Sequence, residues 1–177
     1  MTNLRKVEAI LAYFANYPDM KYLGKVKLMK LFYFLDFDHL RQYGSPVTYD
    51  KYVNLEHGPI PSNIKNLVDS AADDPDTAYL SDVIKCEFPL NTDKMCKIVP
   101  RRSFTPEDED LFSDSELKTM QAVARKYSAA RADKIERDSH QEAPWRETEK
   151  LDEIPYYLAA HDKNSRFSEE DLRLVQS

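Results

Sequence analysis

Hydrophobic residues near the N-terminus recur at the spacing of one helix face. Four of them follow the pattern i, i+3, i+4, i+7: Val7, Ile10, Leu11 and Phe14. Thr2 or Asn3 can cap the start of this helix, because a side-chain oxygen there can accept a hydrogen bond from a free backbone N–H. Pro18 stops the helix, since the residue before a proline avoids helical geometry.

The next hydrophobic stretch has no polar face. From Leu28 to Phe37 every residue is apolar or aromatic except Lys30 and Asp36. A helix that is apolar all round is buried by its neighbours, and this run is shorter than the roughly 20 residues of a membrane span. The pattern predicts the core helix of the protein, from about Gly24 to about Gly44, where glycine suits a helix end.

The residues after the core helix change in character. The β-branched and aromatic residues at 47–49 and 52–55 predict one or two short strands. The sequence His57-Gly58-Pro59-Ile60-Pro61 predicts a rigid turn. Ser62 is expected to cap a helix that continues to about Ala72.

A β-hairpin is predicted from residues 83–88 and 94–99, joined by a turn at 89–93. If the turn is symmetric about its middle residue, Cys86 lies opposite Cys96. A shift of one residue would reverse the faces of a strand, so the register depends on the turn.

The remaining chain shows helix signals. Thr105-Pro106 begins a helix with a cap and a proline at the first position. Ser113 and Glu116 form a capping box, in which each side chain bonds the other's backbone N–H. Ser128 is expected to cap a helix to about Asp138, Pro144-Trp145 ends that region, and a short helix follows Ser168.

These elements predict an α+β fold that is mainly α, a helical domain around a buried central helix with a small antiparallel sheet or hairpin. The chain has 177 residues, which suits one domain. We expect this domain at 1–149 and a C-terminal extension at 150–177, packed on the domain or trailing from it.

Charge and composition narrow the function. The net charge is -6, and a protein that binds mainly nucleic-acid phosphates is usually basic, so a nucleic-acid partner is not expected. Only three glycines occur, which excludes a glycine-rich phosphate loop. The N-terminus lacks a secretion-signal pattern and no apolar run suits a membrane. We therefore expect a cytoplasmic protein whose two cysteines are reduced thiols.

Four lysines lie around the start of the core helix: Lys21, Lys25, Lys27 and Lys30. We expect the first three to be solvated. Lys30 has apolar neighbours, so it either extends outward to solvent or meets Asp36 or another carboxylate.

No recognised catalytic motif occurs in the sequence, and no enzyme, metal or cofactor is expected. Asp36 and His39 are one helical turn apart, which could place an acid–base pair or a metal on one face. A buried aspartate hydrogen-bonded to a neighbour is the favoured interpretation, because buried carboxylates persist when they are paired. A small hydrolase-like enzyme using Asp36, His39 and His57 stays as an alternative.

Several segments together resemble the SocA-like Panacea domain, known from bacterial and phage proteins. They are Lys27–Phe34, Tyr43-Gly44, Glu56–Pro59, Ser139-His140 and Pro144-Trp145. The core-helix segment followed by the His-Gly-Pro turn is the more specific part. The family often carries a bulky aromatic before this turn, where this chain has Leu55-Glu56.

The resemblance implies a mainly helical fold, a small sheet and an antitoxin that binds a protein toxin. It suggests structural roles for the following motif residues: Lys30, Leu31, Phe34, Phe37, Gly44, Gly58, Pro59 and His140. A polar–aromatic cluster near the surface is expected to contact the partner through Tyr33, Asp36, His57 and Trp145.

The main hypothesis is therefore an antitoxin that neutralises a cognate toxin by direct binding. A proteolytic adaptor that delivers the toxin to a protease is the first alternative, because at least one protein with this domain is implied to work in that way.

Overall fold

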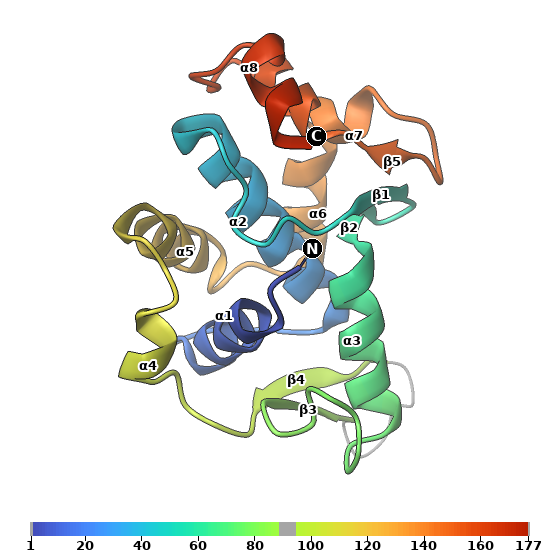
Figure 1. Ribbon diagram of the computed structural model, residues 1–177. Coiled ribbons are helices and arrows are strands. Elements are labelled where there is room, and N and C mark those ends of the chain that lie inside the picture. Colours follow the sequence, from blue (N-terminus) through green and yellow to red (C-terminus); the bar gives the residue numbers. More distant parts are fainter. Residues whose placement is uncertain (1, 89–94, 177) are drawn as a thin grey trace.

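The helix α2 (Lys25–Tyr43) runs through the middle of the protein, and the other elements are packed around it (Figure 1). The computed structural model describes residues 2–88 and 95–176, and the predicted mainly helical α+β class is confirmed. The other α-helices are α1 (Leu4–Asn16), α3 (Ser62–Asp73), α4 (Pro106–Glu109), α5 (Asp114–Tyr127), α6 (Ala132–His140), α7 (Ala143–Arg146) and α8 (Glu169–Arg173). Two 3₁₀ helices, η1 (Tyr156–His161) and η2 (Leu174–Gln176), lie near the C-terminus.

Burial of α2 explains its apolar composition. The helix contacts α5, α6, β2 and η1. Leu31 and Phe37 are 0% exposed and Phe34 is 3% exposed. Burying a side chain of this size contributes about 1.5–3 kcal/mol, so α2 is the centre of the hydrophobic core.

The helix ends follow the capping signals of the sequence. Asn3 accepts hydrogen bonds from two backbone N–H groups at the start of α1. Gly44 ends α2 with φ +84°, a left-handed conformation that suits glycine. Capping boxes begin α4 at Thr105, α5 at Ser113 and α8 at Ser168. These expected helices are confirmed.

Two of the expected caps are wrong. Ser62 is the first residue of α3, and its hydroxyl donates to the carbonyl oxygen of Lys51 instead of capping the helix. The helix α6 begins after Arg131, three residues beyond the expected cap at Ser128, which belongs to the end of α5. The Pro144-Trp145 region was expected to end a helix, but it forms the short helix α7, with proline in the first turn.

A three-stranded antiparallel sheet has the order β2-β1-β5, with β1 (Tyr52–Leu55), β2 (Gly58–Pro61) and β5 (Glu153–Ile154). The expected rigid turn at 57–61 is mostly the strand β2. It is an edge strand, where prolines are tolerated because one side makes no ladder hydrogen bonds. Residues 47–49 are not a strand, because Asp36 binds their backbone in place of a neighbouring strand.

The strands β3 (Ile84–Glu87) and β4 (Lys97–Pro100) form the predicted hairpin, but in another register. Cys86 pairs with Ile98, so the expected pairing of Cys86 with Cys96 is wrong by two positions. The expected turn at 89–93 lies outside the described residues.

A disulfide joins Cys86 and Cys96, whereas reduced thiols were expected. Their Cα atoms are 5.3 Å apart, within the usual range for a disulfide. The two cysteines are diagonal neighbours across the hairpin, and this geometry depends on the register that the sequence did not predict.

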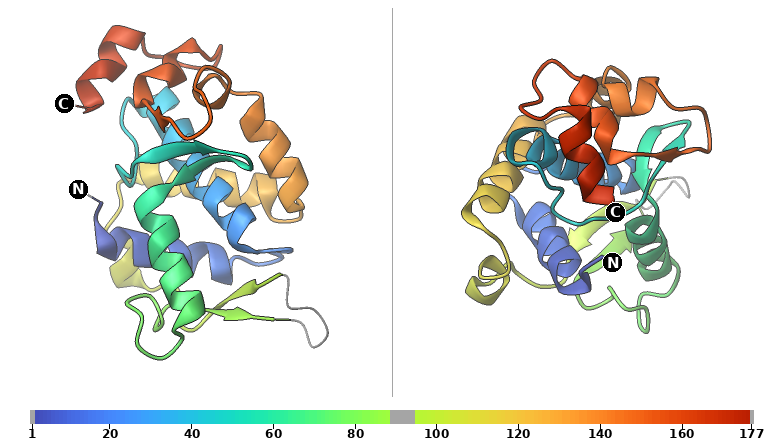
Figure 2. Two further views of the ribbon diagram at one scale, coloured as in Figure 1. Left: turned by 90° about the vertical axis from the view of Figure 1, so that its right-hand side faces the viewer. Right: turned by 45° about the horizontal axis from the view of Figure 1, so that its top comes forward.

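The last part of the chain lies against one end of α2 (Figure 2). Tyr52 of β1 pairs with Ile154 of β5, and the backbone N–H of Arg166 donates to the carbonyl oxygen of Arg41. Leu172 of α8 is 1% exposed. Residues after 150 therefore contribute to the core and to the sheet.

Candidate functional site

A buried lysine joins the core helix α2 to the start of the edge strand β2. The Nζ atom of Lys30 donates a hydrogen bond of 2.9 Å to the carbonyl oxygen of Pro59. Burial lowers the pKa of Lys30 to about 7, against the attraction of Glu136. Lys30 therefore neither reaches solvent nor meets Asp36, and its carboxylate neighbour comes from α6.

Gly58 is the point where three elements meet. Its φ is +99°, a conformation that residues with a side chain rarely adopt. A Cβ atom there would lie 2.8 Å from Oγ of Ser139 and 2.9 Å from Cε of Lys30. Both the backbone angle and the space require glycine at this position.

The end of α6 and the start of α7 complete this cluster with an aromatic pair. The rings of His140 and Trp145 are stacked, with centroids 3.9 Å apart and planes inclined by 18°. Nδ1 of His57 lies 3.2 Å from Oε1 of Glu136, and the His57 side chain is 63% exposed. Within the described residues, Nε2 of His140 is buried and has no hydrogen-bond partner. We call Lys30, His57–Pro59, Glu136, Ser139, His140 and Trp145 the motif cluster.

Lys27 is also buried, contrary to the expected solvation. Its Nζ atom donates to the carbonyl oxygens of Lys21, Ser128 and Ala130, at 2.6, 3.1 and 2.7 Å. The hydrogen bonds fix the loop between α5 and α6 against the start of α2. Lys27 shares a helix face with Leu31, and this spacing is the sequence signal that indicates its burial.

Asp36 is buried and binds the segment of the chain that follows α2. Its carboxylate accepts hydrogen bonds from the backbone N–H groups of Val47 and Thr48 and from the hydroxyl groups of Thr48 and Tyr52. Burial raises the pKa of Asp36 to about 6, and these hydrogen bonds oppose the shift. The favoured interpretation of a hydrogen-bonded buried aspartate is confirmed.

The residues of the catalytic alternative are engaged separately. The ring nitrogens of His39 lie 2.6 Å from the carbonyl oxygen of Ser45 and 3.0 Å from Oγ of Ser115. Within the described residues, no hydrogen bond joins any two of Asp36, His39 and His57. The geometry gives no nucleophile–base contact among the three.

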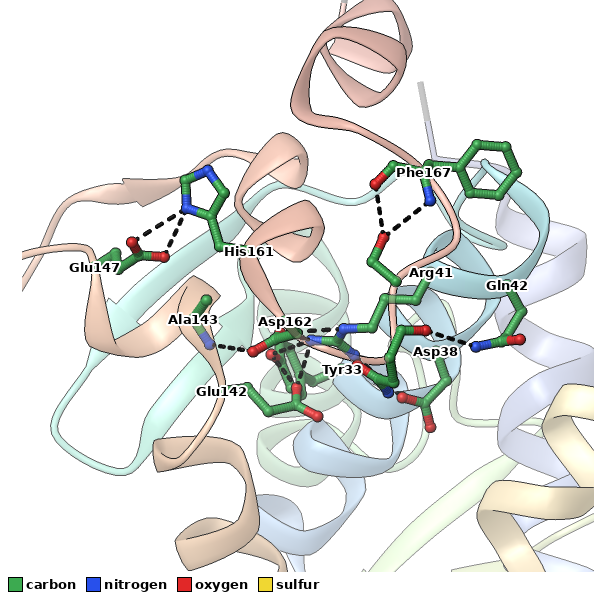
Figure 3. Close-up of polar contacts among 12 residues, drawn as sticks. Tyr33, Asp38, Arg41, Gln42, Glu142, Ala143, Glu147, His161, Asp162 and Phe167 are labelled. Atoms are coloured by element: carbon green, nitrogen blue, oxygen red, sulfur yellow. Dashed lines mark hydrogen bonds and ion pairs between the residues drawn. The ribbon is translucent and has the colours of Figure 1, made fainter.

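A second polar centre surrounds a buried arginine (Figure 3). The guanidinium of Arg41 contacts Glu142 and Asp162 at 2.7 Å each, and Asp38 at 3.2 Å. The hydroxyl of Tyr33 donates to Glu142 at 2.5 Å. Burial raises the pKa of Glu142 to about 7, although Arg41 opposes this shift.

Arg41 was not predicted as a site residue. It lies four residues after Phe37 and eight after Tyr33, on one face of α2. An arginine on a buried helix face is a signal for a buried ion-pair partner, but the sequence does not say which carboxylates supply it. Glu142 precedes α7 and Asp162 follows η1, while Asp38 lies on α2 itself.

The expected surface cluster does not form. Tyr33 and Asp36 are 0% exposed, so the prediction that they lie near the surface is wrong. They lie on the sides of α2 that face the rest of the core, and each points to a different polar centre. His57 is exposed and Trp145 is half-buried.

A groove of about 440 Å³ lies beside the motif cluster, between α2, α3 and the β1–β2 hairpin. We call it the α2–α3 groove. Its floor is apolar and consists of Val26, Met29, Leu55, Ile60 and Val68. Its rim consists of Lys25, Glu56, His57, Lys65, Asp69 and Lys150. His57 therefore belongs to both features.

Two further features concern membranes and metals in the part of the chain that the structure describes. There, no helix combines the length and the apolar character needed to cross a lipid bilayer. Among the same residues, no group of three or more metal-ligating side chains converges on one point.

The family model described as "Antitoxin SocA-like, Panacea domain" matches residues 28–146, about two thirds of the chain. This range includes α2 from Leu28 onward, the β1–β2 hairpin and the whole motif cluster. Comparisons with curated proteins and with solved structures gave no match.

Proposed function

Because the chain belongs to the antitoxin SocA-like, Panacea domain family, we propose that it neutralises a cognate protein toxin by binding it directly. The family match is the observation that carries this proposal. The antitoxin family implies a protein partner such as a toxin. We propose that the two proteins meet in the cytoplasm, where both are synthesised.

The polar groups of the core support binding as the mode of action. Asp36 and Arg41 hold segments of the fold together through several hydrogen bonds each. The side chains of these groups are occupied by structural contacts. A scaffold of this kind can inhibit a toxin with its surface and needs no reaction centre.

We propose that His57 and Trp145 contact the toxin. His57 is exposed at the tip of the hairpin, and tryptophan is often an anchor at protein interfaces. For Tyr33 and Asp36 we propose a supporting role, because both side chains are fully buried.

The test is co-expression of the full chain with the protein encoded by the neighbouring gene. We expect that protein to stop growth alone and the pair to grow normally. The two purified proteins should form a complex in size-exclusion chromatography. A neighbour that is harmless alone, or that stays toxic beside this chain, would contradict the proposal.

The same cells separate sequestration from delivery to a protease. Toxin half-life is measured after protein synthesis is stopped, with and without this chain. Direct neutralisation predicts an unchanged or longer half-life. A shorter half-life that depends on one cellular protease would favour the adaptor alternative.

A further inference from the structure

We infer that the α2–α3 groove receives the apolar face of a toxin helix flanked by acidic side chains. This inference rests on the proposed function and names the partner surface that it requires. Figure 2 (left) shows α3, the β1–β2 hairpin and the N-terminal half of α2 around this region.

The floor of the groove is apolar along its whole length. Met29, Ile60 and Val68 form its base, while Val26 and Leu55 are half-buried at its sides. A volume of about 440 Å³ is enough for one or two bulky side chains of a partner. Apolar surface surrounded by polar residues is typical of protein interaction sites.

The charges of the rim indicate the charge of the segment that binds the groove. Asp69 binds both Lys25 and Lys65, at 3.1 and 2.6 Å, so two lysines share one carboxylate. Of the other charged rim residues, Lys150 and Glu56 make no ion pair with any described residue. The rim thus has more lysines than acids, although the whole chain has a net charge of -6.

This local excess of positive charge is complementary to an acidic partner segment. Complementary rim charges increase association rates and determine which segment binds. A basic segment would instead meet the lysines of the rim with like charge.

A helix fits this surface better than an added strand. The edge strand β2 contains Pro59 and Pro61, and proline has no backbone N–H to donate to an incoming strand. An amphipathic helix needs no such donors, because its apolar side chains at i and i+3 or i+4 enter a groove directly. The charged groups lie at the rim and not on the floor, where a small ligand would need polar partners.

The first test inserts a charge into the floor. Leu55→Glu is compared with Leu4→Glu, which alters another leucine, 39% exposed and outside the groove. Binding of each full-length variant to the purified neighbouring-gene protein is measured by calorimetry. We expect Leu55→Glu to weaken binding at least about tenfold and to abolish growth rescue, as for a central interface residue. We expect Leu4→Glu to bind like the unaltered chain.

The second test uses the rim, where a substitution leaves the core intact. Lys150→Glu is compared with Lys163→Glu, since both lysines are exposed and make no ion pair with a described residue. We expect Lys150→Glu to reduce the association rate severalfold, with a smaller effect at high salt. We expect little change for Lys163→Glu.

The outcomes separate the inference from the proposed function. If the unaltered chain does not rescue growth, the proposed function fails. If it rescues growth but Leu55→Glu and Lys150→Glu both bind normally, the groove assignment is overturned and the antitoxin role stands. Equal losses in Lys150→Glu and Lys163→Glu would also overturn it, because they would reflect overall charge. Binding lost in Leu55→Glu through unfolding would leave Lys150→Glu to decide.

Discussion

The ammonium group of Lys30 donates a hydrogen bond to the carbonyl oxygen of Pro59, 2.9 Å away, inside the protein. This contact joins the core helix to the edge strand of the sheet, directly beneath the tip that carries His57. The stability of the hairpin is therefore coupled to the protonation of a buried lysine.

Lys30→Met should change how stability depends on pH. The pKa of Lys30 is about 7 in the folded protein and about 10.4 in an unfolded chain. Below pH 7 the folded protein bears the full cost of burying the charge, and this cost disappears as pH rises toward 10. We expect the free energy of unfolding of the original protein to rise relative to Lys30→Met over this range, by at most about 1.4 kcal/mol per pH unit.

Urea unfolding at pH 6.5 to 9.5, in steps of about one unit, measures this difference. Lys163→Met, which removes an exposed lysine, is the control and should show no such trend. A difference between Lys30→Met and the original protein that stays constant with pH would contradict the prediction.

Asp36→Ala should destabilise the fold strongly. The substitution leaves the backbone N–H groups of Val47 and Thr48 without acceptors, and each unsatisfied buried donor costs about 1–3 kcal/mol. We expect a loss of at least about 3 kcal/mol in the free energy of unfolding. Asp82→Ala, at an exposed site, should stay within about 0.5 kcal/mol. Equal losses in the free energy of unfolding for the two substitutions, measured in urea, would contradict the structural role of Asp36.

Gly58→Ala should lower stability by about 1–3 kcal/mol, since it places a side chain at φ +99° and against Ser139 and Lys30. Gly24→Ala is a matched control, because its added Cβ would meet one carbonyl oxygen at 3.3 Å and its φ is -103°. Thermal unfolding followed by circular dichroism compares the two variants. A larger loss for Gly24→Ala would exclude the proposed constraint at Gly58.

Arg41→Met should destabilise the protein increasingly as pH rises. We propose that residues 150–177 form an extension packed on a domain at 1–149, with the Arg41–Asp162 ion pair as its polar link. Without the guanidinium, the part-buried carboxylates of Glu142 and Asp162 lose their cation, and breaking a fully buried pair costs about 3–5 kcal/mol, which is an upper bound here. Burial already raises the pKa of Glu142 to about 7, so protonation should reduce the loss at low pH.

Unfolding of Arg41→Met at about pH 5.5 and about pH 8 measures this trend. Arg146→Met, at an exposed site at the end of α7, should behave like the original protein. A loss that is the same at both pH values would show that packing, and not charge, is what Arg41 supplies.

The Cys86–Cys96 disulfide predicts that the unfolded protein, purified without reductant, contains no free thiols. Closing a loop with a sequence separation of 10 stabilises by about 2–3 kcal/mol in the chain-entropy model. Reduction should lower stability by this amount, and the double variant Cys86→Ser, Cys96→Ser should not respond to reductant. Detection of two free thiols in the unfolded protein before reduction would contradict the disulfide and support the expectation of reduced cysteines.

Much of the helical architecture could be predicted from the sequence, because its signals are local. The periodicity of α1, the apolar run of α2 and the capping boxes of α4 and α5 involve residues within a few turns of one another. The need for glycine at position 58 also followed from a short motif.

The candidate site was predicted less completely. His57, His140 and Trp145 were found through their motifs, but their arrangement with Glu136 was not. The predicted register of β3 and β4 was wrong, because the register depends on a turn whose geometry the sequence does not define.

The amino-acid sequence by itself determined the starts of α1, α2, α4 and α5 and the burial of α2. Tertiary structure alone decided that Lys30 binds Pro59, that Lys27 binds three carbonyl oxygens and that Arg41 meets Asp162, 121 residues away. The physical reason is that a buried charge requires a partner, while the sequence leaves open which distant segment provides it. That choice is made when the whole chain packs.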